Sequence, residues 1–95
     1  MQVEFTNHYK RTVTKILKKH YLRQSIIDDT ISLLESDYKN EKLNFKKIVC
    51  KRDKKRHSIR VLGSSYRILF SIIEDTAYLM CICSHDDYDK FNKKC

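Results

Sequence analysis

The sequence has no proline, no tryptophan and only one glycine, Gly63, among its 95 residues. Glycine and proline are the usual residues of linkers, so their scarcity argues against a long linker or a disordered tail. No stretch is apolar enough to span a membrane, and no signal-peptide pattern opens the chain. We therefore expect a single domain over residues 1–95, located in the cytoplasm and without a membrane partner.

Cysteine is also too scarce and too irregularly spaced for a secreted disulfide scaffold, with four in the chain. Cys81 and Cys83 are two residues apart in an apolar run, which is not the C-x₂-C spacing that zinc prefers. They are followed by His85 and by three aspartates, so a metal site is the alternative to simple packing. We favour packing of the two thiols as small hydrophobic groups, and predict no metal and no cofactor.

Basic residues are abundant: 20 Lys and Arg stand against 12 Asp and Glu, for a formal net charge of +8. Such a charge favours a polyanion or an acidic protein as the partner. The stretch "KKIVCKRDKKR" concentrates this charge and predicts an arm that binds the RNA backbone, the alternative being a solvated loop. The candidate RNA-binding residues are Lys46, Lys47, Lys51, Arg52, Lys54, Lys55 and Arg56.

The first half of the chain predicts a short strand, Val3–Thr6, and then two helices. Asn7 is the expected N-cap of the first helix, which should reach about His20. Ser25–Asp28 has the spacing of a capping box and should open the second helix. A short connection makes the pair an antiparallel helical hairpin. The expected apolar stripes are Val13, Ile16, Leu17 and Tyr21 on the first helix, and Ile27, Ile31, Leu34 and Tyr38 on the second.

The second half changes to a strand pattern. "HSIRVL", "SYRILFSII" and "TAYLMCICS" are separated by "GS" and "ED", which predicts two successive hairpins and a three-stranded meander. The preceding "LNFKKIVCK" fits either a strand or an extended arm. The expected fold is α+β, with a small antiparallel sheet, formed by the first strand and the meander, and the helical hairpin packed on one face.

The register of the first hairpin follows if Gly63 and Ser64 form a two-residue type II′ turn. Arg60 then faces Arg67 directly across the two strands, which costs roughly 0.2–1 kcal/mol by like-charge opposition. An anion bound between the two arginines would reverse the sign of that cost, whereas splayed side chains would simply lie in solvent. The opposite face should be apolar and pack against the two helices. Its expected residues are Ile59, Val61, Tyr66, Ile68, Phe70, Leu79, Cys81 and Cys83.

With this order of elements, and with "SIRVLGSSYRILFSIIED" as the most specific piece, the chain resembles the RelE/ParE superfamily of bacterial toxins. The resemblance implies a cytoplasmic toxin neutralised by a cognate antitoxin. Members similar to RelE cut mRNA on the ribosome without a metal, and this is the predicted function. Members similar to ParE instead act on DNA gyrase without catalysis. A third hypothesis is a basic nucleic-acid-binding module that has no catalytic activity.

The resemblance also implies site residues. Arg67 matches the family's phosphate-stabilising arginine, while Ser58 stands where some of the nucleases have a second basic residue. His85 and Tyr88 resemble the His/Tyr pair that several members of the family place after the last strand, and Phe91 is the alternative to Tyr88 for the tyrosine of that pair. The strand should end near Ser84, so that the chain can turn the imidazole of His85, a group that exchanges protons near neutral pH, toward Arg67. The predicted catalytic residues are Arg60, Arg67, His85 and Tyr88.

Overall fold

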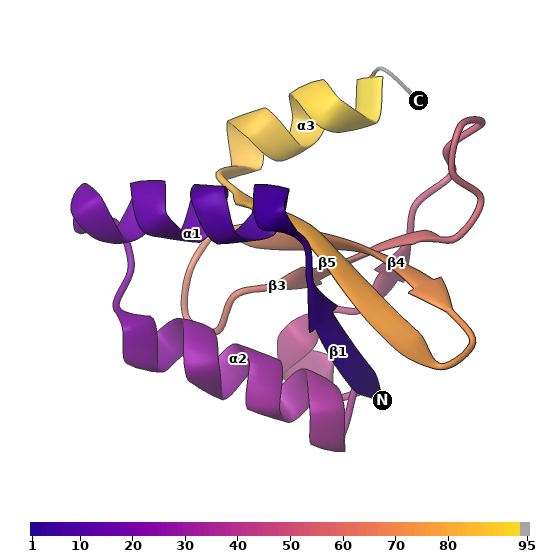
Figure 1. Cartoon of the computed structure of the whole chain (residues 1–95), viewed down its shortest axis with the longest axis horizontal. Helices are drawn as coiled ribbons and strands as arrows, with labels where there is room; N and C mark the ends of the chain where they lie inside the picture. Colours follow the sequence, from indigo (N-terminus) through magenta and orange to yellow (C-terminus); the bar gives the residue numbers. More distant parts are fainter. Residues whose placement is uncertain (94–95) are drawn as a thin grey trace.

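The computed structural model describes residues 1–93 and contains a five-stranded sheet in the order β1-β5-β4-β3-β2. Helices α1 and α2 pack against one face of this sheet, and α3 packs against the other (Figure 1). The elements are β1 (Gln2–Phe5), α1 (Asn7–Lys18), α2 (Gln24–Ser36), the 3₁₀ helix η1 (Glu41–Leu43), β2 (Lys46–Lys47), β3 (Arg56–Arg60), β4 (Arg67–Ile73), β5 (Thr76–Cys83) and α3 (His85–Lys93).

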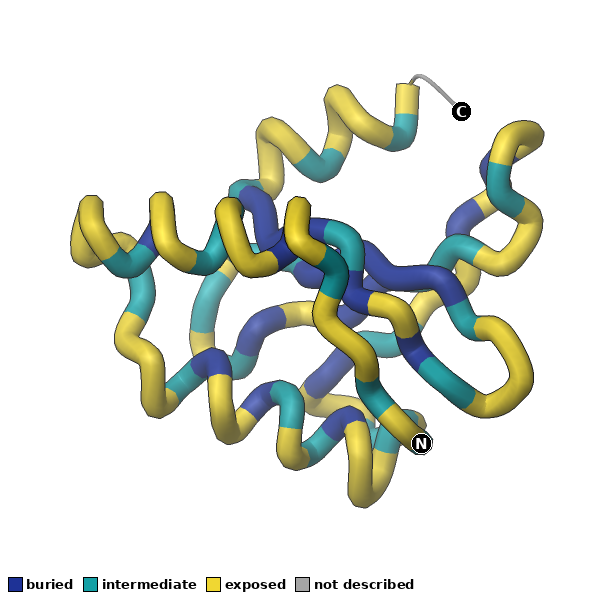
Figure 2. The backbone as a smooth tube through the Cα atoms, viewed as in Figure 1, coloured by how far each residue is buried: buried dark blue, intermediate teal, exposed yellow. Residues whose placement is uncertain are grey.

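The main core lies between the sheet and the helices α1 and α2, where the buried parts of the backbone trace are concentrated (Figure 2). Phe70, Ile59 and Leu79 are completely buried there. These are residues that the alternating strand pattern assigned to the helix-covered face, so this part of the predicted core is confirmed. The other members of the core are Tyr9, Ile16, Ile27, Leu34, Leu43, Val61, Ile68, Ala77 and Ile82.

The first strand departs from the expected sheet, because β1 pairs with β5 in parallel, Val3 opposite Ala77. The meander of β3, β4 and β5 is antiparallel as predicted. A hairpin fixes the direction of consecutive strands, whereas more than half of the chain separates β1 from β5. The helices form the long connection that a parallel pair requires.

Both helix starts were predicted one or two residues away from their positions in the structure. The N-cap of α1 is Thr6, whose Oγ1 accepts a hydrogen bond from the backbone N–H of Tyr9 at 3.2 Å. The N-cap of α2 is Arg23, without a side-chain cap, so Ser25 lies inside the helix and forms no capping box. Neighbouring threonine and serine residues offer several capping registers, and packing of the apolar stripe selects one of them.

The helices also end earlier than expected. α1 stops at Lys18, and His20 and Tyr21 lie in the connection beyond it, with Tyr21 58% exposed. α2 stops at Ser36, so Tyr38 packs from the following turn, edge-on against Phe45 at 5.3 Å between ring centroids. Within residues 1–93, no helix is both long and apolar enough to cross a membrane.

Two tight turns join the strands of the meander. The loop after β3 runs from Leu62 to Ser65, and Ser64 donates its N–H to the carbonyl of Val61 at 3.1 Å. Gly63 is thus the second central residue of that turn, with φ +66°, as in a type II turn rather than the expected type II′ turn. The predicted pairing of Arg60 with Arg67 is nevertheless correct. Between β4 and β5, Glu74 and Asp75 both have positive φ, the backbone of a type I′ turn.

Candidate functional site

The two arginines predicted to face each other do so, because Arg60 of β3 is the direct partner of Arg67 on β4. Side chains point alternately to the two faces along a strand, and the neighbouring pair Ile59 and Ile68 lies in the core beneath the helices. Both arginine side chains therefore lie on the face opposite α1 and α2. Arg60 is exposed and Arg67 is half-buried. We call this side of the sheet the arginine face; its residues are Ser58, Arg60, Arg67, Leu69, Ser71, Cys81 and Cys83.

A β-bulge decides which residues of β5 belong to that face. The pairing of β4 with β5 passes from Leu69–Cys81 to Phe70–Leu79, which leaves Met80 as an extra residue. One extra residue reverses the inward and outward alternation beyond it. The prediction that Cys81 and Cys83 extend the helix-covered face is therefore wrong: Leu79 and Ile82 are on that face, and the two cysteines are on the arginine face.

The arginine face carries a second, smaller apolar cluster in addition to its charges. Leu69 is 3% exposed and Cys81 4%, although the strand pattern alone would place Leu69 toward solvent. Tyr88 of α3 packs against this cluster. The expected open basic face is thus partly covered by a helix. The remaining members of the cluster are Ile48, Cys50 and Cys83.

The covering helix α3 was not predicted, since its polar sequence suggested only a turn. Ser84 caps it, because its Oγ accepts a hydrogen bond from the N–H of Asp87 at 3.3 Å. Asp86 and Asp87 lie in the first turn and Lys90 and Lys93 in the last. This arrangement of charge complements the helix dipole, so Asp86 and Asp87 have a structural role at the start of α3. A serine followed by acidic residues was the signal in the sequence for a helix start.

Tyr88 is the residue of α3 that reaches the arginines. The guanidinium carbon of Arg67 lies 5.7 Å from the centre of the Tyr88 ring, a cation–π arrangement. The Tyr88 hydroxyl is 3.1 Å from Oγ of Ser58, which is 2% exposed. Ser58 therefore fixes the phenol beside Arg67. The structure brings Arg67, Arg60 and Tyr88 together, and adds Ser58, which the sequence comparison had counted only as a departure from the family pattern.

His85 is placed differently. It begins α3, its side chain is 58% exposed, and its Nε2 lies 3.4 Å from a carboxylate oxygen of Asp89, one turn further along the helix. Within residues 1–93, no hydrogen bond or ion pair joins His85 to Arg67. β5 does end just before Ser84 as predicted, but the helix that follows directs the imidazole toward its own solvent side.

The predicted RNA-binding arm is divided between β2 and an irregular loop. Lys46 and Lys47 form β2 and pair with Ser58 and His57, which resolves the choice between strand and arm in favour of a very short strand. Lys51, Arg52, Lys54 and Lys55 are exposed in the loop that follows. The seventh residue, Arg56, opens β3 and is half-buried.

Asp53 anchors this basic loop to the sheet. Its carboxylate accepts hydrogen bonds from the Ser71 hydroxyl at 2.5 Å and from the backbone N–H of Lys55 at 3.0 Å, and it lies 3.6 Å from Nε of Arg56. Burial of the carboxylate tends to raise the pKa of Asp53, but the hydrogen bonds from Ser71 and Lys55 and the charge of Arg56 outweigh it and lower that pKa. The anion is therefore the form that holds the loop.

Cys81 and Cys83 are free thiols on the arginine face. The hydrogen bond from the Cys83 thiol lowers the pKa of Cys81, and the same bond together with burial raises the pKa of Cys83. In the described part of the chain, no group of three or more His, Cys, Asp or Glu side chains is arranged to hold a metal ion.

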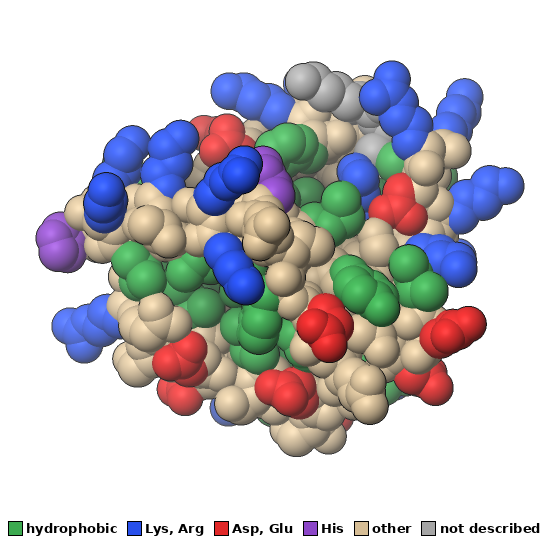
Figure 3. Space-filling model, in the orientation of Figure 1, with side chains coloured by type: hydrophobic (Ala, Val, Ile, Leu, Met, Phe, Trp, Pro, Cys, Tyr) green, Lys and Arg blue, Asp and Glu red, His purple; other side chains and the backbone are tan. Residues whose placement is uncertain are grey.

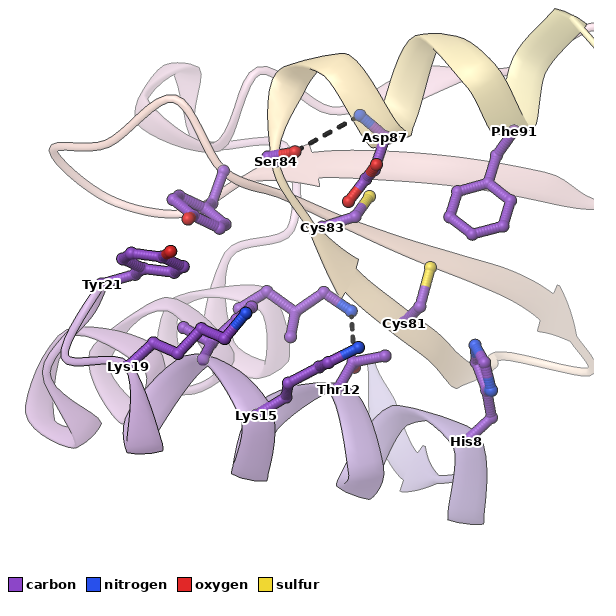
Figure 4. A pocket seen from close by; sticks show the side chains of 13 residues that line it. His8, Thr12, Lys15, Lys19, Tyr21, Cys81, Cys83, Ser84, Asp87 and Phe91 are labelled. Atoms are coloured by element: carbon purple, nitrogen blue, oxygen red, sulfur yellow. Dashed lines mark hydrogen bonds between the residues drawn. The ribbon is translucent and has the colours of Figure 1, made fainter.

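A cavity of about 510 Å³ lies between α1 and α3, over the end of β5 (Figure 4). Phe91 of α3 and both cysteines line it. Lys15 of α1 and Lys19, the C-cap residue of that helix, also line it, and the surface on this side shows blue basic groups over α1 and α3 (Figure 3). Sequence patterns gave no indication of this cavity, because it is formed by segments more than sixty residues apart.

Comparison with known proteins supports the fold. No protein-family model and no curated protein matches the sequence. Among solved structures, E. coli YafQ aligns over 92% of this chain and 96% of its own, with a TM-score of 0.73 and 9% identity. A chain of the E. coli DinJ–YafQ toxin–antitoxin complex aligns over 90% and 93%, with a TM-score of 0.72 and 11% identity.

A chain of the RelB–RelE antitoxin–toxin complex from Methanococcus jannaschii aligns over 92% of this chain and 95% of its own, at a TM-score of 0.62 and 20% identity. The chain therefore has the α+β fold of the RelE-like toxins. The resemblance drawn from "SIRVLGSSYRILFSIIED" is confirmed at the level of fold.

Proposed function

We propose that this chain is the toxin of a toxin–antitoxin pair and that it stops translation by cutting mRNA on the ribosome. The observation that carries the proposal is the pair Arg60 and Arg67 on a RelE-like sheet, with the ring of Tyr88 next to Arg67. Two cations that repel each other in the free protein form a favourable site when a phosphate lies between them. Their cost to the fold is explained by an anionic substrate.

In the proposed reaction, the 2′-hydroxyl of a nucleotide gives its proton to a base and attacks its own 3′-phosphate. The bond from phosphorus to the 5′-oxygen of the next nucleotide breaks, this oxygen takes a proton from an acid, and a 2′,3′-cyclic phosphate remains. Arg67 and Arg60 stabilise the charge that develops on the phosphate, and each well-placed donor contributes about 2.7–4 kcal/mol to such a step. No step requires a metal ion or a cofactor. The arginines, held on adjacent strands, need little reorganisation when the charge appears, because their backbone positions are fixed by the sheet register.

Tyr88 and His85 are the proposed proton-transfer groups. The phenol of Tyr88 is held by Ser58 at 3.1 Å and stands beside Arg67, so it is positioned to donate a proton or a hydrogen bond to the phosphate or the leaving group. His85 is one helical turn before Tyr88 and exposed, hence accessible to a bound RNA. We assign it the role of acid or base at the rim of the site.

The exposed lysines and arginine of the basic loop provide the remaining contacts. Lys51, Arg52, Lys54 and Lys55 project from a loop that Asp53 ties to β4. We assign them, with Lys46, Lys47 and Arg56, to the RNA backbone, because phosphate contacts supply most of the non-specific affinity for nucleic acids. The same basic surface is the proposed binding site of a cognate antitoxin with an acidic segment, by charge complementarity.

A second candidate function is non-catalytic binding of DNA gyrase, as in the ParE branch. The observation that favours it is the position of His85, which points to Asp89 rather than to Arg67, together with the absence of a basic side chain at Ser58. A basic nucleic-acid-binding module without catalysis remains the third candidate and would share the same arginine face.

The deciding experiment is inducible expression in bacteria with pulse labelling of protein and DNA synthesis. We expect protein synthesis to fall first, and purified protein to cut mRNA only when ribosomes are present, with loss of both effects in Arg67→Ala. Early failure of DNA synthesis with induction of the SOS response would instead support gyrase as the target. Growth without any arrest, with RNA binding retained, would support the non-catalytic module.

A further inference from the structure

The cavity between α1 and α3 has one end whose chemistry differs from that of its apolar floor. Two tyrosines, Tyr21 and Tyr66, close this end, while Lys15 and Lys19 stand on the α1 side and Asp87 on the α3 side. Figure 4 shows Asp87 extending from α3 toward the cavity, and Lys15 and Lys19 rising from the opposite wall. Aromatic rings, ammonium groups and a single carboxylate around one hollow are the elements of a nucleotide site.

The two rings have a geometry that suits stacking. Their centroids are 6.4 Å apart and their planes are inclined by 32°. Aromatic side chains stack on nucleic-acid bases, so an opening of this pair would admit a flat base between the rings. Tyr21 is 58% exposed, and its ring is available at the surface.

The charged groups divide the cavity into two parts. The ammonium of Lys19 lies 6.0 Å from the Tyr21 ring, which places a cation beside the aromatic end. Burial, with the neighbouring Tyr21 and the negative charge of Asp87, raises the pKa of Tyr66, and Asp87 lines the same cavity. A phosphate would therefore be attracted to the α1 wall, and a base N–H donor to the α3 wall.

The position of the cavity connects it with the proposed cleavage site. Tyr66 directly precedes Arg67, and Asp87 directly precedes Tyr88. Ser84, another lining residue, follows Cys83, which is the strand partner of Arg67. Tyr66 packs on the helix-covered face and Arg67 lies on the arginine face, so the cavity reaches the Arg67–Tyr88 pair through Cys83 and Asp87, where the next nucleotide of a bound strand would lie.

We propose that this cavity binds the base of a nucleotide adjacent to the phosphate held by Arg67, with Tyr21 and Tyr66 stacking on it and Asp87 accepting its N–H groups. The inference rests on the proposed function and adds base selectivity to it. Guanine is the preferred base, since its N1–H and exocyclic amino group offer two adjacent donors to one carboxylate. Uracil offers a single N–H between two carbonyl oxygens and should bind least well.

The test is an NMR titration of the free protein with GMP and with UMP, at fixed ionic strength and without ribosomes. GMP should bind more tightly than UMP and shift the ring resonances of Tyr21 and Tyr66. Tyr21→Ala should weaken both nucleotides roughly ten-fold through loss of stacking, while the matched variant Tyr21→Phe should keep the affinity. Asp87→Asn should weaken GMP selectively and leave UMP nearly unchanged.

Equal affinity for both nucleotides, insensitive to Tyr21→Ala and to Asp87→Asn, would show that only charge attracts them and would overturn the inference. So would shifts confined to the arginine face. Both substituted side chains are exposed, so folding is not at risk, and the circular dichroism spectrum of each variant checks this. Because no ribosome is present, a protein that binds GMP in this way but never cuts mRNA would contradict the proposed function and not the base site.

Discussion

The two faces of the sheet use the same strands but are organised differently. The face beneath α1 and α2 is filled by apolar side chains such as Phe70 and Ile59, all fully buried. The arginine face combines a small apolar cluster with opposed arginines, a buried serine and a helix of nine residues that covers part of it. The first face supplies most of the stability, whereas the second has features that cost stability and fit a ligand. Function is therefore expected on the second face.

Two substitutions in β4, one on each face, should distinguish the functional face from the stabilising face most clearly. Arg67→Ala should lower mRNA cleavage by at least 10²-fold, since it removes a phosphate donor, yet change the free energy of unfolding little. Relief of the repulsion with Arg60, about 0.2–1 kcal/mol, offsets a lost cation–π contact of similar size. Phe70→Ala, three residues away on the other face, should cost about 3–5 kcal/mol. Cleavage assays and urea denaturation measure both.

A strongly destabilised Arg67→Ala protein that still arrests growth would show that the arginine face is structural. Both faces of the sheet would then contribute to the free energy of unfolding, and the catalytic site would have to lie elsewhere in the protein.

The next prediction concerns α3, the cover of the arginine face. His85→Ala should lower ribosome-dependent cleavage by about 10²-fold, the scale of lost acid–base help. Tyr88→Phe should have a comparable effect, because it removes the hydroxyl but keeps the ring over Arg67. Treatment of the purified protein with EDTA, removed before ribosomes are added, should change nothing in either the wild type or the variants. Full activity of His85→Ala would leave Tyr88 as the proton-transfer group on α3, and loss of activity with EDTA would contradict the metal-free proposal.

A smaller effect is expected at Asp53, which joins the basic loop to the arginine face. Asp53→Asn should destabilise the protein by about 1 kcal/mol at neutral pH, the usual contribution of one such hydrogen bond. The folded-state pKa of Asp53 is lowered, so its stabilising effect is present above the unfolded-state pKa. It is lost as the pH falls through the folded-state value. Thermal unfolding should show the difference from wild type at pH 7 and its disappearance in strong acid.

If the difference between Asp53→Asn and wild type were the same at both pH values, the carboxylate charge would not be what holds the loop. Lys54→Gln is a suitable control, since it changes an exposed residue in the same loop.

The smallest effect lies at the turn between β4 and β5, away from both faces. Asp75 has φ +66°, a left-handed conformation that glycine adopts without steric cost. Relief of this strain exceeds the entropic cost of a glycine only slightly, so Asp75→Gly should stabilise the protein by about 0.5 kcal/mol, with cleavage unchanged. A shift of the denaturation midpoint at constant slope is the measurement, and destabilisation would mean that the Asp75 side chain contributes a stabilising interaction.

The strand pattern also predicted the residues of the two faces with different success. Alternation along β3 and β4 correctly predicted Ile59, Ile68 and Phe70 in the core, and the opposition of Arg60 and Arg67. It failed along β5, because the bulge at Met80 moved Cys81 to the other face. The signal was visible in "LMCIC", where consecutive apolar residues indicate that both faces are covered, but the pattern cannot tell which residue is the extra one.

The candidate site was predictable in its residue types and only partly in its arrangement. Arg67 and Tyr88 came from the resemblance, and the structure places them in contact. The roles of Ser58 and Asp53 were missed, because each acts through a partner at least eighteen residues away in the chain. The direction of His85 was also missed, since the short polar stretch after β5 gave no apolar stripe by which to recognise a helix.

The sequence by itself determined the order of the first strand, the two helices and the meander, the register of the Arg60–Arg67 pair and the basic charge of the chain, because periodicity, turn residues and charge are local properties. Tertiary structure alone decided the parallel pairing of β1, the face of Cys81 and Cys83, the position of Tyr88 over Arg67 and the cavity between α1 and α3. Each of these joins segments distant in the chain, and the packing that selects one arrangement among many has no trace in local spacing.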